Sequence, residues 1–94
     1  MIRISSRALR QIDEILDYIA AENPRASAAV KAAIQQSMEW IAKRPFMSPI
    51  VYGHHIRSKL LPRYQYRIFY SIDGPDGVIR NVRSTRRLRP WAKR

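Results

Sequence analysis

The sequence predicts an α+β domain in which an N-terminal helical hairpin packs on a small antiparallel β-sheet of three or four strands. Apolar residues recur at helical spacing through residues 6–44, and residues 64–83 alternate as half-buried strands do. A chain of 94 residues is long enough to bury an ordinary core, so we expect one domain over 1–94. Its expected parts are the helical hairpin, a sheet at about 54–83 and a basic tail at 84–94.

The first elements are a short strand and an amphipathic helix. Met1 to Ile4 alternates in character and is expected to join the sheet as an edge strand. Ser5 and Ser6 are good N-cap residues, and an apolar stripe after them predicts a helix over residues 6–21. The members of this stripe are Leu9, Ile12, Ile15, Leu16 and Ile19.

A second helix completes the hairpin. Asn23 is a suitable N-cap and Pro24 suits the first helical position, and the pair Arg44-Pro45 ends the helix. Its predicted buried face consists of Val30, Ala33, Ile34, Ser37 and Ile41. Residues 45–53 contain two prolines and a glycine, which predicts a connection rather than an element of secondary structure.

The stretch 64–73 is the predicted central strand, because most of its residues are aromatic or β-branched. Alternation divides it into an apolar face and a second face. The apolar face holds Tyr66, Ile68, Tyr70 and Ile72, and the second face holds Arg67, Phe69 and Ser71. Residues 73–77 have the glycines and proline of a turn, so residues 78–83 form the returning strand of a β-hairpin.

A further strand is predicted at 54–61, with cations at alternate positions on one side. Arg57 and Lys59 lie on that side, with His55 as a possible third member. Because His54 and His55 are adjacent, at most one of them can reach a given face of the sheet. No second metal ligand stands at a useful spacing and the chain has no cysteine, so we expect no metal site, no cofactor and no disulfide.

The net charge of +11 is concentrated in the second half of the chain. Residues 1–44 hold seven Lys and Arg against five Asp and Glu, whereas residues 45–94 hold eleven against two. Such a charge attracts polyanions, so we expect an acidic partner. Apolar runs far shorter than about 20 residues, and the lack of an export signal, predict a cytoplasmic protein with no membrane partner.

Three stretches together resemble the toxins of the RelE/ParE superfamily, the toxic halves of bacterial type II toxin-antitoxin pairs. They are Asp13 to Ile19 in the first helix, Tyr66 to Tyr70 in the central strand and Val82 to Arg87 after the last turn. Their order and spacing cover nearly the whole chain. The resemblance implies the helical hairpin and sheet described above, a cognate antitoxin as partner, growth arrest and a role in plasmid stabilisation.

The superfamily has two main activities, and the resemblance leaves both open with a slight preference for the second. RelE-like members cut mRNA in the ribosome, and ParE-like members bind DNA gyrase and block it. By motif, Arg67 and Arg87 match arginines associated with RNA cleavage. The residues expected to bind RNA or another target are Arg57, Lys59, Arg86 and Arg89.

The acid-base residues of the RNA-cleaving branch are not matched. Ser84 stands where many relatives have His, and the tail offers Trp91 rather than Tyr. A serine hydroxyl does not replace an imidazole as a base near neutral pH. This departure favours ParE-like inhibition of gyrase over RNA cleavage. A third alternative is a simple basic module that holds nucleic acid phosphates without cutting or inhibiting, with strongly salt-dependent binding.

Overall fold

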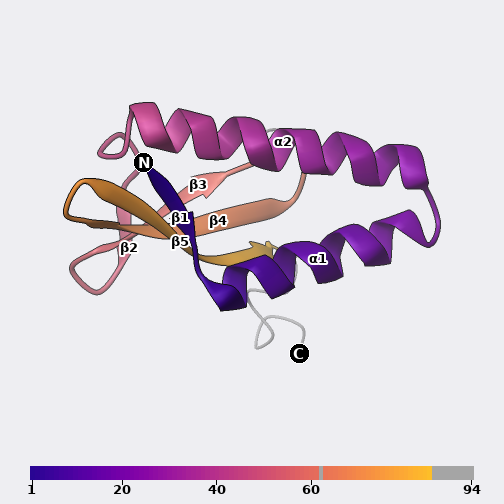
Figure 1. Cartoon of the computed structure of the whole chain (residues 1–94), viewed down its shortest axis with the longest axis horizontal. Coiled ribbons are helices and arrows are strands. Elements are labelled where there is room, and N and C mark those ends of the chain that lie inside the picture. The colour runs from indigo at the N-terminus through magenta and orange to yellow at the C-terminus, as the bar shows by residue number, and fades with distance from the viewer. Residues whose placement is uncertain (62, 86–94) are drawn as a thin grey trace.

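A computed structural model of the chain describes residues 1–61 and 63–85. These residues form two helices and five strands in the order β1 (Ile2–Ile4), α1 (Ser6–Ala20), α2 (Pro24–Lys43), β2 (Ile50–Tyr52), β3 (Ile56–Leu60), β4 (Tyr66–Asp73) and β5 (Asp76–Ser84). The helices form an antiparallel hairpin that lies along one side of the sheet (Figure 1). The α+β architecture and the helical hairpin are therefore confirmed.

Both helices begin at the predicted caps. Ser5 Oγ accepts a hydrogen bond from the backbone N–H of Ala8 at 3.1 Å, and Asn23 Oδ1 accepts one from the N–H of Ala26 at 3.0 Å. Each cap satisfies a donor that the first turn of a helix leaves free. Pro24 occupies the first position of α2, where its missing N–H costs nothing.

The sheet has one more strand than the sequence predicted, and it is mixed rather than wholly antiparallel. The strand order within the described residues is β1-β5-β4-β3-β2. The edge strand β1 runs parallel to β5, with Ile2 opposite Gly77, while β3, β4 and β5 pair antiparallel. Residues 45–53 are not only a connection, because Ile50–Tyr52 pairs with β3 as the other edge strand. Three residues are too few for the alternation that identifies a strand.

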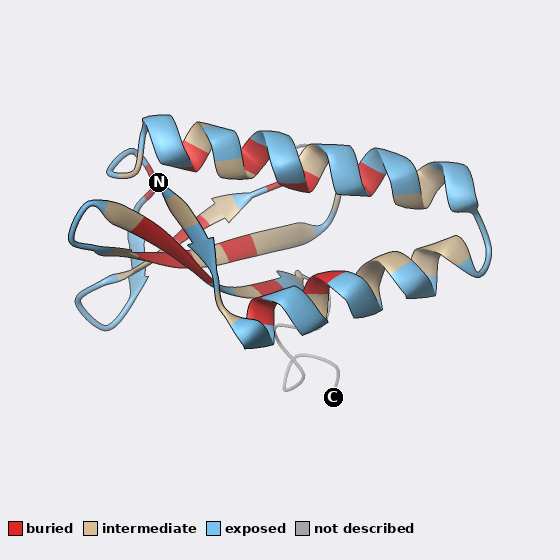
Figure 2. Cartoon of the chain, in the orientation of Figure 1, coloured by how far each residue is buried: buried red, intermediate tan, exposed pale blue. Residues whose placement is uncertain are grey.

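The hydrophobic core lies between the helices and the face of the sheet that they cover, which we call the helix face (Figure 2). From the sheet, Ile68, Tyr70, Ile79 and Val82 are buried. From α2, the buried residues are Val30, Ile34, Ser37 and Ile41, which confirms the predicted face of that helix. From α1, Ala8 and Ile12 are buried, whereas Leu9 is exposed and was wrongly placed in the buried stripe.

Tyr70 joins the end of α2 to the sheet. Its ring is fully buried, and its hydroxyl donates to the backbone carbonyl of Pro45 at 2.8 Å. Burial of a tyrosine hydroxyl requires such a partner. The predicted packing role of Tyr70 is confirmed. No helix within the described residues is long and apolar enough to cross a membrane.

Candidate functional site

The face of the sheet opposite the helices, called the open face below, carries a pair of arginines. Arg67 on β4 lies directly opposite Arg83 on β5. Their neighbours Ile68 and Val82 are also paired and are buried on the helix face. Because successive side chains on a strand point to opposite faces, Arg67 and Arg83 both project onto the open face.

A third arginine reaches the same face through a β-bulge. The register passes from Phe69 opposite Asn81 to Tyr70 opposite Ile79, which leaves Arg80 as an extra residue on β5. Arg80 Nε donates to Ser71 Oγ at 2.7 Å. Ser71 follows the buried Tyr70 on β4 and so lies on the open face.

A buried serine also holds Arg67. Arg67 Nη1 donates to Ser58 Oγ on β3 at 2.6 Å. Ser58 and Ser71 are 3% and 2% exposed, so both hydroxyls are fixed within the sheet. Each one takes up part of the donor capacity of a guanidinium and leaves other N–H groups free for a ligand. The serines thereby orient Arg67 and Arg80.

These three arginines have no carboxylate partner in the described part of the chain. The ion pairs there join Asp73 and Asp76 to Arg3 and to the N-terminal amino group, at 3.3 to 3.9 Å. The other acidic residues lie in the helical hairpin, on the far side of the sheet: Asp13, Glu14, Asp17 and Glu39 on the helices and Glu22 in the turn between them. Like charges directly opposite each other destabilise a sheet, so the Arg67 and Arg83 pair is suited to an anionic partner.

Arg57 and Lys59, expected beside Arg67, lie on the other side of the sheet. They pair with the buried residues Tyr70 and Ile68, which places both on the helix face at its margin. Lys59 Nζ lies 4.6 Å from the ring centroid of Trp40 on α2, a cation–π contact. The alternation of these cations was predicted correctly, but the structure separates them from the open face.

Arg86, Arg87 and Arg89 lie outside the described residues. His54 and His55 are exposed in the turn before β3, whereas the predicted strand began at His54. Leu60, the partner of Arg67, is five residues further along, roughly 16 Å from His55 at the rise of a strand. Neither histidine therefore lies beside Arg67.

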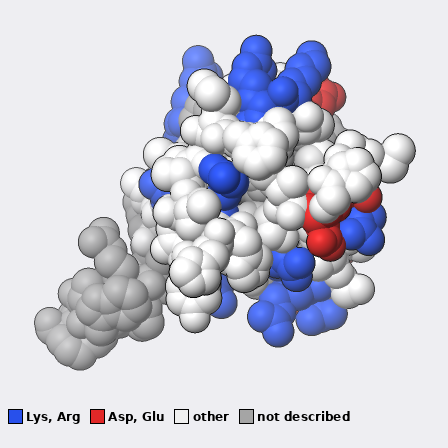
Figure 3. Space-filling view, turned by 90° about the vertical axis from the view of Figure 1, so that its left-hand side faces the viewer, with Lys and Arg blue, Asp and Glu red and all other residues white. Residues whose placement is uncertain are grey.

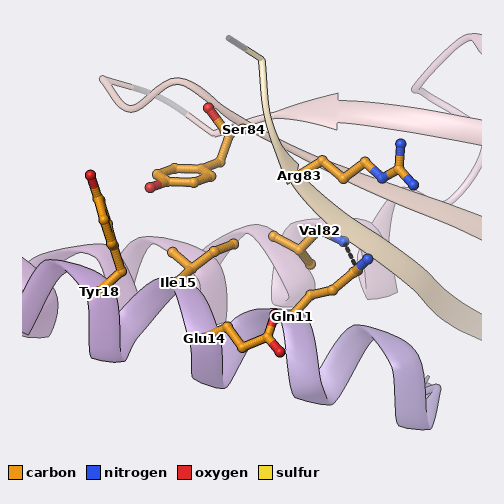
Figure 4. A pocket seen from close by; sticks show the side chains of 8 residues that line it. Gln11, Glu14, Ile15, Tyr18, Val82, Arg83 and Ser84 are labelled. Carbon is orange, nitrogen blue, oxygen red and sulfur yellow. Dashed lines mark hydrogen bonds between the residues drawn. The ribbon is translucent and has the colours of Figure 1, made fainter. Parts of the chain in front are cut away.

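A groove runs between α1 and the end of β5, with a volume of about 620 Å³. Ile15, Tyr66 and Val82 form its apolar part, and Glu14 and Tyr18 stand on the helix side. In Figure 4 Val82 points toward α1, while the Arg83 side chain, which also lines the groove, lies on the other side of β5 from the helix. The groove and the arginines thus flank the same strand.

Gln11 fastens α1 to this strand. Its Oε1 accepts a hydrogen bond from the backbone N–H of Val82 at 2.8 Å, drawn in Figure 4, and its Nε2 donates to Asn81 Oδ1 at 3.2 Å. β1 pairs with β5 only as far as Ile79, so the side chain of Gln11 replaces a strand partner beyond that point. The groove therefore has a fixed wall.

Sequence reasoning named Arg67 but missed two of its neighbours. Arg83 could have been found, because it alternates with Val82 in a predicted strand. The position of Arg80 could not have been predicted, because the direction of its side chain depends on a β-bulge that no glycine or other turn residue marks in the sequence. The anchoring serines also gave no signal, because a serine in a strand has no preferred partner in the sequence.

The described residues thus form an α+β domain with a helical hairpin on one face of the sheet and arginines on the other. The family described as "ParE toxin of type II toxin-antitoxin system, parDE" matches residues 2–89. The chain therefore belongs to the ParE toxin family and is a toxin of a type II toxin-antitoxin system. The predicted preference for the ParE-like branch is confirmed.

A solved structure supports the fold. The protein of the structure titled "Chromosomal ParDE TA system from P. aeruginosa" has a TM-score of 0.78 and 13% sequence identity. The alignment covers 88% of this chain and 92% of that one. At this identity the likeness concerns the fold alone. A comparison with curated proteins gave no match.

Proposed function

We propose that this toxin arrests growth by inhibiting DNA gyrase, and that Arg67, Arg80 and Arg83 on the open face contact its target. Membership of the ParE toxin family over residues 2–89 supports the gyrase target. A cognate antitoxin neutralises the toxin. Arg86, Arg87 and Arg89 add positive charge in the sequence after β5 and are further candidates for contact with the target.

One observation favours inhibition by binding over RNA cleavage. Within the described residues, the hydrogen-bond partners of Arg67 and Arg80 on the open face are serine hydroxyls. General acid-base catalysis requires a group of suitable pKa within hydrogen-bond reach of the reacting atoms. Guanidinium and hydroxyl groups bind and orient anions, but they do not exchange protons readily near neutral pH.

RelE-like cleavage of mRNA is the second candidate, because Arg67 does lie on the open face with two other arginines. In that case Arg67 and Arg87 would stabilise the charge of the phosphate in the transition state. Arg57 and Lys59 lie on the opposite face of the sheet, the helix face, and would not contact the same phosphate. The simple nucleic-acid binding module stays a third alternative, which growth arrest relieved by the antitoxin would exclude.

Two assays with the purified chain separate the candidates. We expect inhibited supercoiling by gyrase and intact mRNA in a ribosome-dependent cleavage assay. Cleaved mRNA with unaffected gyrase, and loss of that cleavage in Arg67→Ala, would establish the RelE-like activity instead. Expression with and without the product of the adjacent open reading frame tests growth arrest and its neutralisation.

A further inference from the structure

Large apolar side chains are exposed at one end of the molecule, around the edge strand β2. Half of the ten exposed large apolar residues in the described chain fall within seven consecutive positions. We call them the edge patch: Phe46, Met47, Ile50, Val51 and Tyr52, each between 46% and 76% exposed. Figure 3 views this end, and it shows a mostly uncharged surface with Lys and Arg above, below and near its centre, and with Asp and Glu at its right-hand side. Contiguous exposed apolar surface of this kind marks interaction sites.

The backbone of β2 is open to a further strand. β2 ends the strand order, so its outer side has no neighbouring strand within residues 1–61 and 63–85. Proteins usually protect such an edge with charged residues or proline. The other edge strand, β1, carries Arg3, whereas Ile50, Val51 and Tyr52 include no charged residue. β2 is short and its register against β3 shifts between Ile50 and Tyr52, but none of its residues is charged, so an extended peptide can add to its open side.

Hydrogen bonds from Arg57 and Tyr70 fix the first part of the segment that carries the edge patch. Arg57 Nη1 donates to the carbonyl of Ser48 at 2.6 Å and to that of Phe46 at 3.3 Å. Its guanidinium lies 5.3 Å from the ring centroid of Phe46. Tyr70 holds the carbonyl of Pro45 in the same way. Because these bonds order the segment before any partner arrives, binding loses less conformational entropy.

Charge distinguishes between the possible occupants. A second copy of this chain would bring another +11 net charge against the first. The cations Lys43 and Arg44 precede the edge patch in sequence, and both are exposed. An extended segment with apolar residues and carboxylates would satisfy both the apolar patch and these cations.

We propose that β2 is the docking edge for an extended acidic segment of the antitoxin, which adds as a further strand and covers the edge patch. The inference rests on the proposed pairing of this toxin with an antitoxin. Arg57 then acts as a positioning residue for the patch rather than as a residue that contacts the target.

Hydrogen–deuterium exchange on the wild-type chain tests the added strand. The amides of residues 50–52 are followed in the free chain and in its complex with the product of the adjacent open reading frame. We expect exchange there to slow by at least about tenfold on binding, because edge amides gain partners. Unchanged exchange in the complex would overturn the proposal. Exchange at these amides that is already slow in the free chain, and becomes slower as the chain's concentration rises, would also overturn the proposal. It would indicate that a second copy of the chain covers the edge.

Substitutions at Val51 test the chemistry of the occupant. Val51→Lys removes apolar contact and should weaken the complex about tenfold, and Val51→Asp, which also repels carboxylates, should weaken it by about 100-fold. Leu9, 51% exposed on α1 against 48% for Val51, provides the matched controls Leu9→Lys and Leu9→Asp. Full affinity of Val51→Asp would overturn the docking edge alone. A wild-type chain that does not bind the product at all would overturn the antitoxin pairing as well.

Discussion

Arg67 and Arg83 lie directly opposite each other on adjacent strands, on the face of the sheet that neither helix covers. Within the described residues no carboxylate lies within ion-pair distance of either guanidinium. Repulsion between the two guanidinium groups lowers the stability of the free chain, and an anionic partner that binds between them would remove this repulsion.

Removal of one member of the pair should stabilise the free chain. Arg83→Ala is expected to raise the free energy of unfolding by about 0.2–1 kcal/mol at low salt, because it relieves like-charge repulsion across the strands. The gain should shrink as salt screens the charges. Urea unfolding at two salt concentrations measures it. Lys31→Ala, an exposed charge removed from the middle of α2, is the control, and an equal gain there would refute the pairwise origin.

Ser58 should stabilise the sheet through Arg67. Ser58→Ala removes the 2.6 Å hydrogen bond to Arg67 Nη1 and is expected to cost about 1 kcal/mol of stability. In a double-mutant cycle with Arg67→Ala, the two effects should be coupled by a similar amount. Additive effects would show that the hydroxyl does not hold the arginine in solution. Ser6→Ala, at an exposed serine, should be nearly neutral.

Gln11 should contribute to the stability of the fold through its side-chain oxygen, which accepts a hydrogen bond. Gln11→Leu leaves the backbone N–H of Val82 without a partner and is expected to cost about 1–3 kcal/mol. Gln11→Glu keeps an acceptor for that N–H, so it should cost less. Thermal or urea unfolding compares the two variants. Equal losses would indicate that the packing of the side chain, and not the hydrogen bond, fastens α1 to β5.

The hydroxyl of Tyr70 should contribute to stability where that of Tyr52 does not. Tyr70→Phe removes the 2.8 Å donor to the half-buried carbonyl of Pro45, at an expected cost of about 0.5–1.5 kcal/mol. Tyr52→Phe is the matched control, because that ring is 76% exposed. Similar stability of both variants in urea would contradict a structural role for this hydrogen bond.

The longer elements could be predicted because several local signals agreed. In α2 the N-cap Asn23, Pro24 and the apolar face all indicate the same helix, and its bounds were found nearly to the residue. The strand β2 could not be predicted, because three apolar residues after a proline carry no periodic signal. Leu9 was misplaced for a related reason. A helix at the margin of a sheet buries a narrower stripe than its apolar residues suggest, and the small Ala8 lies inside it.

The site was only partly predictable. Alternation correctly grouped Arg57 with Lys59 and separated Ile68 from Arg67, but alternation within one strand does not say which face the helices cover. That depends on the register between strands, which pairs Lys59 with the buried Ile68. The direction of Arg80 depends on a bulge, so it too is a property of two strands rather than of one.

Inhibition of gyrase by the wild-type chain and by the double variant Arg67→Ala, Arg83→Ala tests the proposed function most directly. The concentration that halves supercoiling should rise at least about tenfold in the double variant, because both target-facing guanidinium groups are lost. Lys31→Ala should behave as the wild type. Equal inhibition by the double variant, with its fold intact, would contradict a target contact on the open face.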